Sequence, residues 1–479
     1  MPAATLEKKS KRGAFLSLVG VAAVLALVIV LENTLDPNRN IIVFTTLKKG
    51  AVYALVAVSM NLLNGFTGLF SLGHAGFMLL GGYAYAIFTI PSAQRESVYY
   101  MYDGSAINFS FPEFFSNLFG GSGAGGAAGM VLGVLIAIVI AGLVAALVAW
   151  LIGLPVLKLK SDYLAIATLG FAEIIRAIFQ WEPGGRITNG ANALKSFPTF
   201  NNFNITDAEG EIVLRLSTSV CFAISALCIF LIVLLINSSY GRAFKAIRED
   251  EVAAEAMGIN LAKHKRLSFI ISSFFAGVGG ALFAMYVNQV QAKTFNSAMT
   301  YELLLIVVLG GMGSISGSAI AAFLYVACGE WWLRFLDSEA AFKSTSDRWA
   351  FIIVLAAAAA ALTALLLWRR KRQGARKFSE LWTACLLGAV VLGYDIYYAA
   401  SGSMEVPFLR TGFRMVVFSV IIMVVVLFFR RGLMGDKELP ARLRELAAFI
   451  RRLAAKIRRP SAGGGKPGAA AGKEAGGDE

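Results

Sequence analysis

Few residues in this chain could do chemistry, and most of them lie within apolar stretches. The 479-residue chain has only two histidines, His74 and His264, which excludes a zinc site built on several histidines. Cys221 and Cys228 are seven residues apart in one predicted helix, about 10.5 Å by helical rise, which is beyond disulfide reach. No polar loop carries a convincing paired-carboxylate, Ser/His or Cys/His arrangement. We therefore expect neither catalytic residues nor a metal site, and no cofactor bound by this chain.

Two apolar stretches are interrupted by a similar pattern of glycine and serine. Residues 62–73 read LLNGFTGLFSLG and residues 307–317 read VVLGGMGSISG, and both contain G-x-x-G-x-x-S with a further glycine within two residues. Helix breaks at membrane depth must line protein or a water-filled cavity, and transporters place substrate routes at such breaks. The pattern predicts an internal repeat of two breaks beside a translocation path. Alternatively, the glycines only allow close helix packing.

The candidate path residues are the polar and small residues at and beside these two breaks. Intramembrane polar groups are costly and usually mark pairs or pathways. Glu173 and Arg176, three residues apart, are expected to pair on one helical face. We expect His74 to be a hydrogen-bonded structural residue rather than a proton carrier. The predicted path residues are Asn61, Gly65, Gly68, Ser71, Gly73 and His74 at the first break, and Glu302, Gly310, Gly311, Gly313, Ser314, Ser316 and Gly317 at the second.

One internal stretch, residues 237–266, concentrates charge of both signs. It reads NSSYGRAFKAIREDEVAAEAMGINLAKHKR, with six basic and four acidic residues. Residues 252–259 are predicted to form a short helical piece that Gly258 stops, and a helix this short needs a partner to pack its Ala/Met face. An ordinary solvated loop is the alternative on composition alone.

The composition places these residues in a membrane protein. The chain is 57% hydrophobic and 15% charged, with mean hydropathy +0.67, whereas soluble domains are about a quarter charged. Basic blocks at residues 1–13, 369–377 and 430–479 account for the net charge of +14. Basic blocks beside apolar spans are typical of cytoplasmic loops. We therefore expect contact with anionic lipid and no nucleic-acid binding.

The predicted fold class is an all-α integral membrane protein, a polytopic helical bundle of about 10–11 apolar spans with two glycine-broken or re-entrant elements. An uncleaved first span is favoured over a cleaved signal peptide. If the basic loops are all placed on the cytoplasmic side, the segment 301–328 must begin and end on the same side of the membrane, as a re-entrant hairpin does. The predicted spans are 14–31, 41–63, 72–90, 126–152, 163–181, 213–236, 267–288, 301–328, 349–368, 380–400 and 412–429.

The sequence divides into six predicted regions around a core membrane domain. The basic segment 436–459 is predicted to form an amphipathic helix that lies on anionic lipid, with a short coiled coil as the alternative. The regions are 1–40 (basic N-terminus and first span), 41–328 (core), 329–407 (an inserted pair of spans with a basic cytoplasmic loop), 408–435 (last span), 436–459 and a disordered tail, 460–479.

Several ordered segments resemble branched-chain amino acid permeases of ATP-binding-cassette importers, of the LivM type. The resemblance covers roughly residues 41–328 and resumes at 408–435. It is carried by NLLNGFTGLFSLGHAGFMLLGGYAYA (61–86), KSDYLAIATLGFAEIIRAIF (160–179), SSYGRAFKAIREDEVAAEAMGIN (238–260), SFIISSFFAGVGGALFA (268–284) and ELLLIVVLGGMGSISGSAIAA (302–322).

The resemblance implies a permease subunit without an ATP site of its own. No G-x-x-x-x-G-K-[ST] motif occurs. It implies a second homologous permease subunit, two cytoplasmic ATPase subunits that carry ATP and Mg²⁺, and a periplasmic solute-binding protein. It also implies a multi-pass protein of the bacterial inner membrane with both termini cytoplasmic. The residues that it assigns to an ATPase-coupling loop are Gly241, Arg242, Arg248, Glu249, Asp250, Glu251, Ala253, Ala254, Glu255 and Gly258.

The expected function is import of branched-chain or related apolar amino acids, driven by partner ATPases; the alternative is an ion-coupled secondary transporter that uses Glu173 or His74. Urea and short amides remain open as substrates. Two departures stand out. Residues 188–194 read TNGANAL where the family usually has T-G-G-x-x-G, and the insert 329–407 has no assigned role.

Overall fold

In the computed structural model, the chain is described at residues 20, 23–35, 40–121, 123–159, 161–206, 212–333, 393, 417–419, 423, 432 and 434. It divides into two units, Met1–Asp436 and Lys437–Glu479, and every described residue belongs to the first. The predicted spans 349–368, 380–400 and 412–429, the amphipathic helix 436–459 and the tail 460–479 lie outside the described residues apart from a few single positions.

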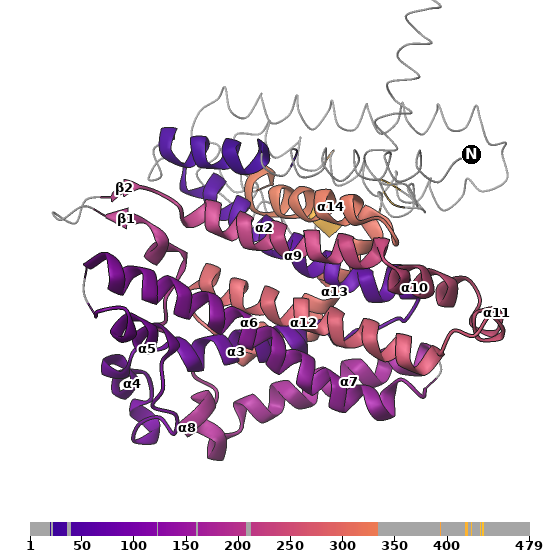
Figure 1. The fold of residues 1–479 in the computed structure, drawn as a ribbon, viewed down its shortest axis with the longest axis horizontal. Coiled ribbons are helices and arrows are strands. Elements are labelled where there is room, and N and C mark those ends of the chain that lie inside the picture. The colour runs from indigo at the N-terminus through magenta and orange to yellow at the C-terminus, as the bar shows by residue number, and fades with distance from the viewer. Residues whose placement is uncertain are drawn as a thin grey trace, which may run out of the picture. The chain divides into compact units, whose positions relative to one another are not determined.

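The described part is built almost entirely from helices (Figure 1), as predicted. A two-stranded antiparallel sheet of β1 (Ile205–Thr206) and β2 (Ile212–Leu214) is the exception in this part. The α-helices are α2 (Ile41–Asn61), α3 (His74–Thr89), α4 (Ser92–Val98), α5 (Phe111–Leu118), α6 (Gly123–Val156), α7 (Ser161–Gln180), α8 (Gly185–Thr188), α9 (Ser217–Asn237), α10 (Ser239–Glu249), α11 (Glu251–Ala256), α12 (Leu261–Val287), α13 (Ser297–Gly310) and α14 (Ile315–Ala327). Two π-helices, η1 (Leu62–Thr67) and η6 (Cys328–Trp332), and four 3-10 turns, η2 (Tyr100–Tyr102), η3 (Glu182–Gly184), η4 (Phe200–Phe203) and η5 (Ala292–Thr294), complete the elements.

Five described helices are long and apolar enough to cross a membrane. They are Ile41–Thr67, Gly125–Val156, Tyr163–Gln180, Ser217–Asn237 and Leu261–Val287. Shorter apolar helices occur at Ala23–Thr34, Ser297–Gly310 and Ile315–Glu330. Each span predicted before residue 329 therefore has a helix in the structure, and the predicted span 301–328 is divided between α13 and α14.

Side-chain caps set the starts of several helices. Asp250 accepts from the backbone N–H groups of the first turn of α11, and Asn260 does the same for α12. Asn296 begins α13 and Ser314 begins α14 in the same way. A side-chain oxygen at the N-cap satisfies an amide that has no partner within the helix, which explains why these helices begin at these residues.

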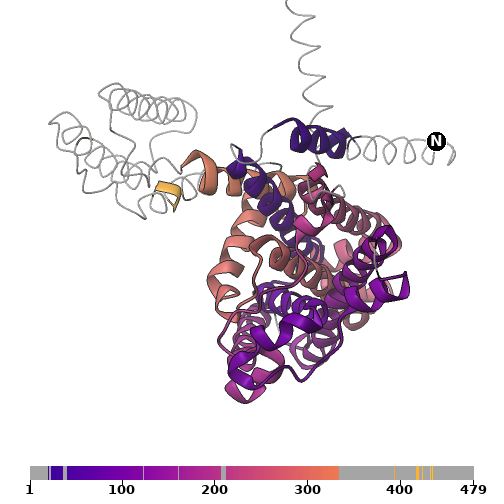
Figure 2. The same cartoon turned by 90° about the vertical axis from the view of Figure 1, so that its left-hand side faces the viewer.

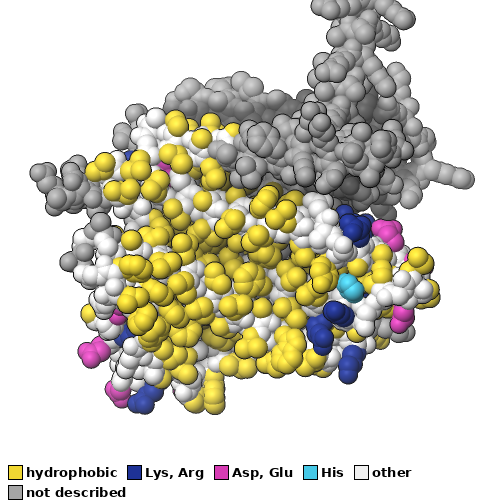
Figure 3. All heavy atoms as spheres, in the orientation of Figure 1, with side chains coloured by type: hydrophobic (Ala, Val, Ile, Leu, Met, Phe, Trp, Pro, Cys, Tyr) yellow, Lys and Arg dark blue, Asp and Glu magenta, His cyan; other side chains and the backbone are white. Residues whose placement is uncertain are grey.

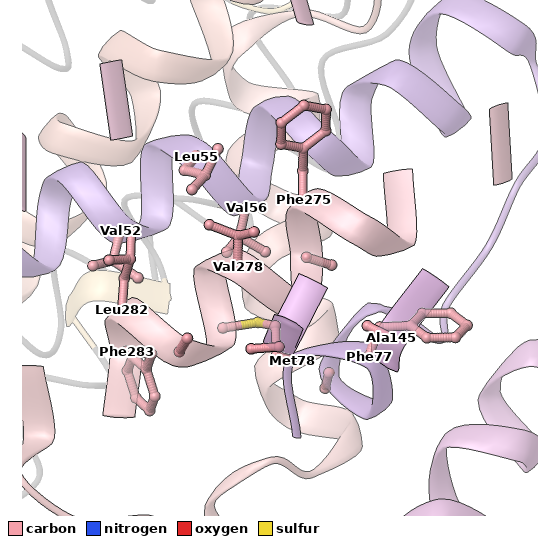
Figure 4. Packing of buried hydrophobic residues seen from close by; sticks show 14 of the residues in the cluster. Val52, Leu55, Val56, Phe77, Met78, Ala145, Phe275, Val278, Leu282 and Phe283 are labelled. Atoms are coloured by element: carbon pink, nitrogen blue, oxygen red, sulfur yellow. The ribbon is translucent and has the colours of Figure 1, made fainter. Parts of the chain in front are cut away.

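The core forms where α2, α3, α6 and α12 pack together (Figure 4). Glycines allow the closest approach: a Cβ atom at position 81 of α3 would lie 2.0 Å from the carbonyl oxygen of Gly277 in α12. The apolar side chains of Val52 and Leu55 on α2 and of Leu282 on α12 are fully buried in the same core. Because the two backbones are in direct contact, the α3–α12 pair is closely packed.

The surface of the described part carries a broad apolar area between two ends that bear charges (Figure 3). Exposed large apolar side chains lie on α6, α7 and α9, among them Leu147, Ile166 and Leu231. The charged α10 and α11 lie at one end of the bundle, and α4, α5, α8 and the strands lie at the other, the end that faces the viewer in Figure 2. A lateral apolar surface with polar ends is what a bilayer requires of a helical bundle.

Candidate functional site

The first predicted break lies between η1 and α3. The helix formed by α2 and η1 ends at Gly68, which has a left-handed backbone (φ +78°) that favours glycine. The chain then runs without helix to Gly73, and α3 begins at His74. Asn64 closes this loop, because its Oδ1 accepts from the Ser71 N–H at 3.1 Å and its Nδ2 donates to the Ser71 carbonyl at 3.3 Å.

The second predicted break separates α13 from α14. Gly311 and Gly313 both have positive φ, +112° and +92°, so the chain turns at these two glycines. Ser314 caps the next helix by accepting from the Gly317 N–H at 3.1 Å. Both predicted interruptions are therefore present as breaks in the structure.

The two breaks, about 250 residues apart in the sequence, contact each other through Asn61. Its Nδ2 donates to the Ser314 carbonyl at 2.9 Å and to Ser318 Oγ at 2.7 Å, and its Oδ1 accepts from the Gly313 N–H at 2.8 Å. A Cβ atom at position 65 would lie 2.6 Å from the Gly313 nitrogen. Glycine at 65 is therefore required for this contact, and one buried asparagine joins both breaks.

The segment α13–α14 has the geometry of a hairpin packed on α2. Near the turn, Ser318 contacts Asn61 at the end of α2. Farther along, Glu330 pairs with Lys49 in the first half of α2, with Nζ and Oε1 2.6 Å apart. The chain after the break therefore runs back antiparallel to α2. That this hairpin is re-entrant in a membrane stays a prediction.

Not every predicted path residue lies at this junction. Glu302 lies close to Tyr53 and within electrostatic range of Lys49 and Glu330, away from the breaks. His74 Nε2 lies 3.0 Å from Ser272 Oγ. The residues that the structure does gather at the junction are Asn61, Gly65, Gly310, Gly311, Gly313, Ser314 and Gly317, with Gly68, Ser71 and Gly73 in the adjoining loop and Ser316 in the first turn of α14.

His74 is held in a buried hydrogen-bond chain rather than in an open space. Ser272 Oγ, its neighbour, donates to the Ser59 carbonyl at 2.6 Å, so the imidazole Nε2–H donates to the serine. The predicted pairing of Glu173 with Arg176 is also present, at 2.6 Å from Nε to Oε2. His74 and Glu173 therefore both have hydrogen-bonding partners within the described part of the chain.

The charged stretch forms two helices at one end of the bundle. Phe244 and Ile247 of α10 are buried against the bundle, and Gly241 contacts the backbone at Ile236. The short α11 instead stands out from the bundle, and two large apolar side chains on it and just after it, Val252 and Met257, are 78% and 83% exposed. The segment therefore has an anchored part and a projecting part.

The projecting part is held in shape by local contacts. Asp250 caps α11, and Glu251 pairs with Lys265 of α12, with Oε2 and Nζ 2.6 Å apart. Gly258 takes a left-handed backbone (φ +83°) directly after the helix, as predicted for a helix stop. Glu255 and Ala253 are exposed, whereas Ala254 is buried. The tip presents a fixed surface of mixed charge with exposed apolar groups.

Arg248, which the resemblance assigns to a coupling loop, takes a position that the sequence did not reveal. Its Nη1 donates to the Gly65 carbonyl at 2.7 Å, so the side chain reaches the first break. Beside it, the ammonium of Lys245 lies 5.6 Å from the ring centre of Phe66. The anchored helix α10 is therefore in direct contact with η1.

Sequence reasoning missed Glu32, a buried carboxylate near the end of the helix at Ala23–Thr34. It accepts from the Thr218 and Ser219 N–H groups at 2.7 and 3.0 Å, and from the hydroxyls of Ser217 and Ser219. A carboxylate at a helix N-terminus is favoured by the free amides and the helix dipole. Glu32 and the helix start that it caps are 185 residues apart in sequence, so no local signal could have revealed this contact.

The loop that departs from the expected glycine pattern takes left-handed backbone at two successive positions. Asn189 and Gly190 have φ values of +59° and +57°. Asparagine tolerates this conformation better than other residues with a side chain. The substitution at 189 is therefore compatible with a glycine-like turn at this point.

Comparison with known proteins identifies relatives over much of the chain. The family model "Branched-chain amino acid transport system / permease component" matches residues 42–345. The Escherichia coli high-affinity branched-chain amino acid transport system permease protein LivM is 31% identical over 301 residues, 58% of this chain and 61% of that protein. A probable LivM of Methanocaldococcus jannaschii is 28% identical over 174 residues, 36% of this chain and 48% of the relative.

A more distant relative is named for the import of a different substrate. The autoinducer 2 import system permease protein LsrC of Yersinia pseudotuberculosis is 27% identical over 165 residues, 33% of this chain and 44% of that protein. No solved structure matches the chain. The chain spans about 61% of the length of the E. coli relative. Because the family model covers residues 42–345, which include both breaks and the charged segment, this chain belongs to the branched-chain amino acid transport system permease component family.

Proposed function

We propose that this chain is the transmembrane permease subunit of an ATP-driven importer for branched-chain or related apolar amino acids. Its family and the LivM relatives support this function. ATP and Mg²⁺ would be bound by two cytoplasmic ATPase subunits, and a periplasmic solute-binding protein would deliver the substrate. A second homologous permease subunit would complete the path, and this chain would transport rather than catalyse.

The projecting tip of α11 is the observation that carries the proposal. Val252 and Met257 expose apolar surface at the charged end of the bundle, beside the exposed Glu255. A helix of fewer than three turns is not stable alone, so a partner that packs on it stabilises it. We infer that this tip docks in a cleft of the ATPase. Nucleotide-driven movement of that subunit would then act on the permease as a lever.

The proposed orientation follows from this docking. The end with α10 and α11 would face the cytoplasm of a bacterium, with the protein in the inner membrane and both termini cytoplasmic. The opposite end, with α4, α5 and α8, would face the solute-binding protein. The basic segments would contact anionic lipid, in keeping with the positive-inside rule.

The proposed substrate route passes the junction of the breaks. A zwitterionic amino acid needs donors for its carboxylate and acceptors for its ammonium group. Hydroxyls of Ser314 and Ser316, backbone carbonyls and the ends of half-helices offer such contacts without strong binding. Weak contact suits a permease that receives its substrate from a separate high-affinity receptor, because tight binding would slow release. The LsrC relative is named for a different cargo, so the cargo must be measured directly.

The test is charge reversal at the tip. Glu255→Lys should lower ATP-driven leucine uptake by reconstituted importer about tenfold or more while leaving the folded permease intact, since the side chain is exposed. Glu182→Lys, an exposed change at the opposite end, is the matched control and should not alter coupling to the ATPase. Wild-type uptake in the Glu255 variant would refute the lever role. Uptake without ATPase subunits, driven by a pH gradient, would instead support the ion-coupled alternative.

A further inference from the structure

Arg248 lies where α10 meets both helix breaks. Its Nη1 donates to the Gly65 carbonyl at 2.7 Å. A Cβ atom at position 313 would lie 2.7 Å from the same Nη1, and one at position 68 would lie 3.3 Å from the Arg248 Cα. The arginine thus contacts the first break from one side and closely approaches the glycine turn of the second.

The carbonyl that Arg248 reaches lies in the last turn before the first break. The helix ends at Gly68, so the final carbonyls of η1 lack the amide partners that a continuing helix would supply. A cationic side chain at a helix C-terminus satisfies such a carbonyl and interacts favourably with the helix dipole. Arg248 therefore acts as a cap from another helix, 183 residues later in the sequence.

The helix that carries Arg248 is fixed to the bundle by neighbouring side chains. Phe244 and Ile247, four residues and one residue before it, are buried, and Lys245 lies over the ring of Phe66 in η1. Residues four apart lie on one face of a helix. A displacement of α10 must therefore act on η1 through packed side chains as well as through the arginine.

The contact continues from the first break to the second. Gly65, whose carbonyl Arg248 holds, lies against Gly313, and Asn61 Oδ1 accepts from the Gly313 N–H at 2.8 Å. A few hydrogen bonds and close contacts therefore connect α10, η1 and the α13–α14 turn, three segments that are distant in sequence. A continuous set of contacts of this kind can bias a bistable element.

We propose that Arg248 is a positioning residue that ties α10 to both breaks, so that movement of α10 moves the breaks together. The role in transport rests on the proposed function, whereas the tie itself is a property of this chain. The sequence resemblance places Arg248 in the loop that contacts the ATPase. In the structure its guanidinium instead points inward to the Gly65 carbonyl at the first break, and the tip around Glu255 is exposed.

The first experiment measures coupling in the complete reconstituted importer. Arg248→Ala should lower the amount of leucine transported per ATP hydrolysed about tenfold or more, the size expected when one charge-assisted hydrogen bond is lost, with hydrolysis itself little changed. Arg248→Lys should recover part of that ratio, because lysine keeps the charge but not the planar fork. Lys158→Ala is the matched control, since Lys158 is an exposed cation in the loop after α6 and lies outside the charged segment 237–266.

The second experiment tests the tie without reference to transport. Spin labels at Tyr240→Cys and Met312→Cys, both exposed, report the distance between α10 and the second break in the assembled complex, with the native cysteines replaced by alanine. We expect one narrow distance distribution with Arg248 and a clearly broader one in Arg248→Ala and, to a smaller degree, in Arg248→Lys.

The two experiments separate the failure of each idea. An unchanged narrow distribution in both arginine variants would overturn the tie, and an unchanged ratio of transport to hydrolysis would overturn its role in transport. If the wild-type complex transports no amino acid, the proposed function fails, and the distance measurement still decides the tie. If Arg248→Ala does not fold, the lysine variant provides both readouts.

Discussion

Asn61 joins the two breaks, and its replacement by leucine tests that junction directly. The substitution keeps the approximate shape of a fully buried side chain and removes its polar atoms. Three short hydrogen bonds are lost, to the Ser314 carbonyl, the Ser318 hydroxyl and the Gly313 amide. Interhelical hydrogen bonds in membranes contribute about 0.6 kcal/mol each, and the amide left without its acceptor costs about 1 kcal/mol more. We expect the free energy of unfolding to fall by about 3 kcal/mol.

The assay is denaturant unfolding of the purified protein in detergent micelles. Asn64→Leu is the matched control, because Asn64 bonds only to Ser71 within the first break, at the longer distances of 3.1 and 3.3 Å, among the described contacts. By the same arithmetic it should cost about 2 kcal/mol, from two lost hydrogen bonds and the Ser71 amide left without its acceptor, which is about 1 kcal/mol less than Asn61→Leu. A thiol introduced by Met312→Cys should also label faster in the Asn61 variant. An Asn61→Leu protein as stable as the control variant, with unchanged labelling, would refute the view that this side chain holds the breaks together.

Two further substitutions test the packing around the junction. Gly81→Ala should destabilise the protein by about 3 kcal/mol in the same assay, because the new Cβ would meet the Gly277 carbonyl, whereas Gly170→Ala, with open space around it, should be neutral; equal stability of the two variants would contradict the close α3–α12 crossing. Glu32→Gln should lower the unfolding free energy by about 2 kcal/mol, because it weakens a charged cap on α9, while the exposed Glu96→Gln should not. A thermal unfolding curve for the Glu32 variant that overlays the wild type would show that the cap is dispensable.

Local signals in the sequence were sufficient to predict the helices and their interruptions. Apolar runs predicted the helices later found as α2, α6, α7, α9 and α12, since a membrane-spanning helix needs a long apolar stretch. Glycine clusters predicted both breaks, because left-handed backbone at Gly68, Gly311 and Gly313 favours a residue without a side chain. The pairing of Glu173 with Arg176 was also predictable, since it depends only on helical spacing.

The same reasoning could not show which polar residues near the breaks lie at the junction and which lie elsewhere. Glu302 and Ser314 are close in sequence, yet Glu302 lies beside Tyr53 and Ser314 lies at the junction. His74 follows the first break directly but bonds to Ser272 on α12. Which face a residue occupies depends on how helices cross, and that information is absent from any single window of sequence.

The sequence by itself determined that this chain is a helical membrane protein with two glycine breaks and one charged segment of mixed sign, because hydropathy, glycine conformational freedom and charge are properties of local stretches. Only the tertiary structure decided that Asn61 reaches Ser318 across 257 positions and that Arg248 reaches Gly65 across 183. Buried polar groups must find partners wherever the packed helices place them. The partner of each group is therefore set by the arrangement of the bundle rather than by its neighbours along the chain.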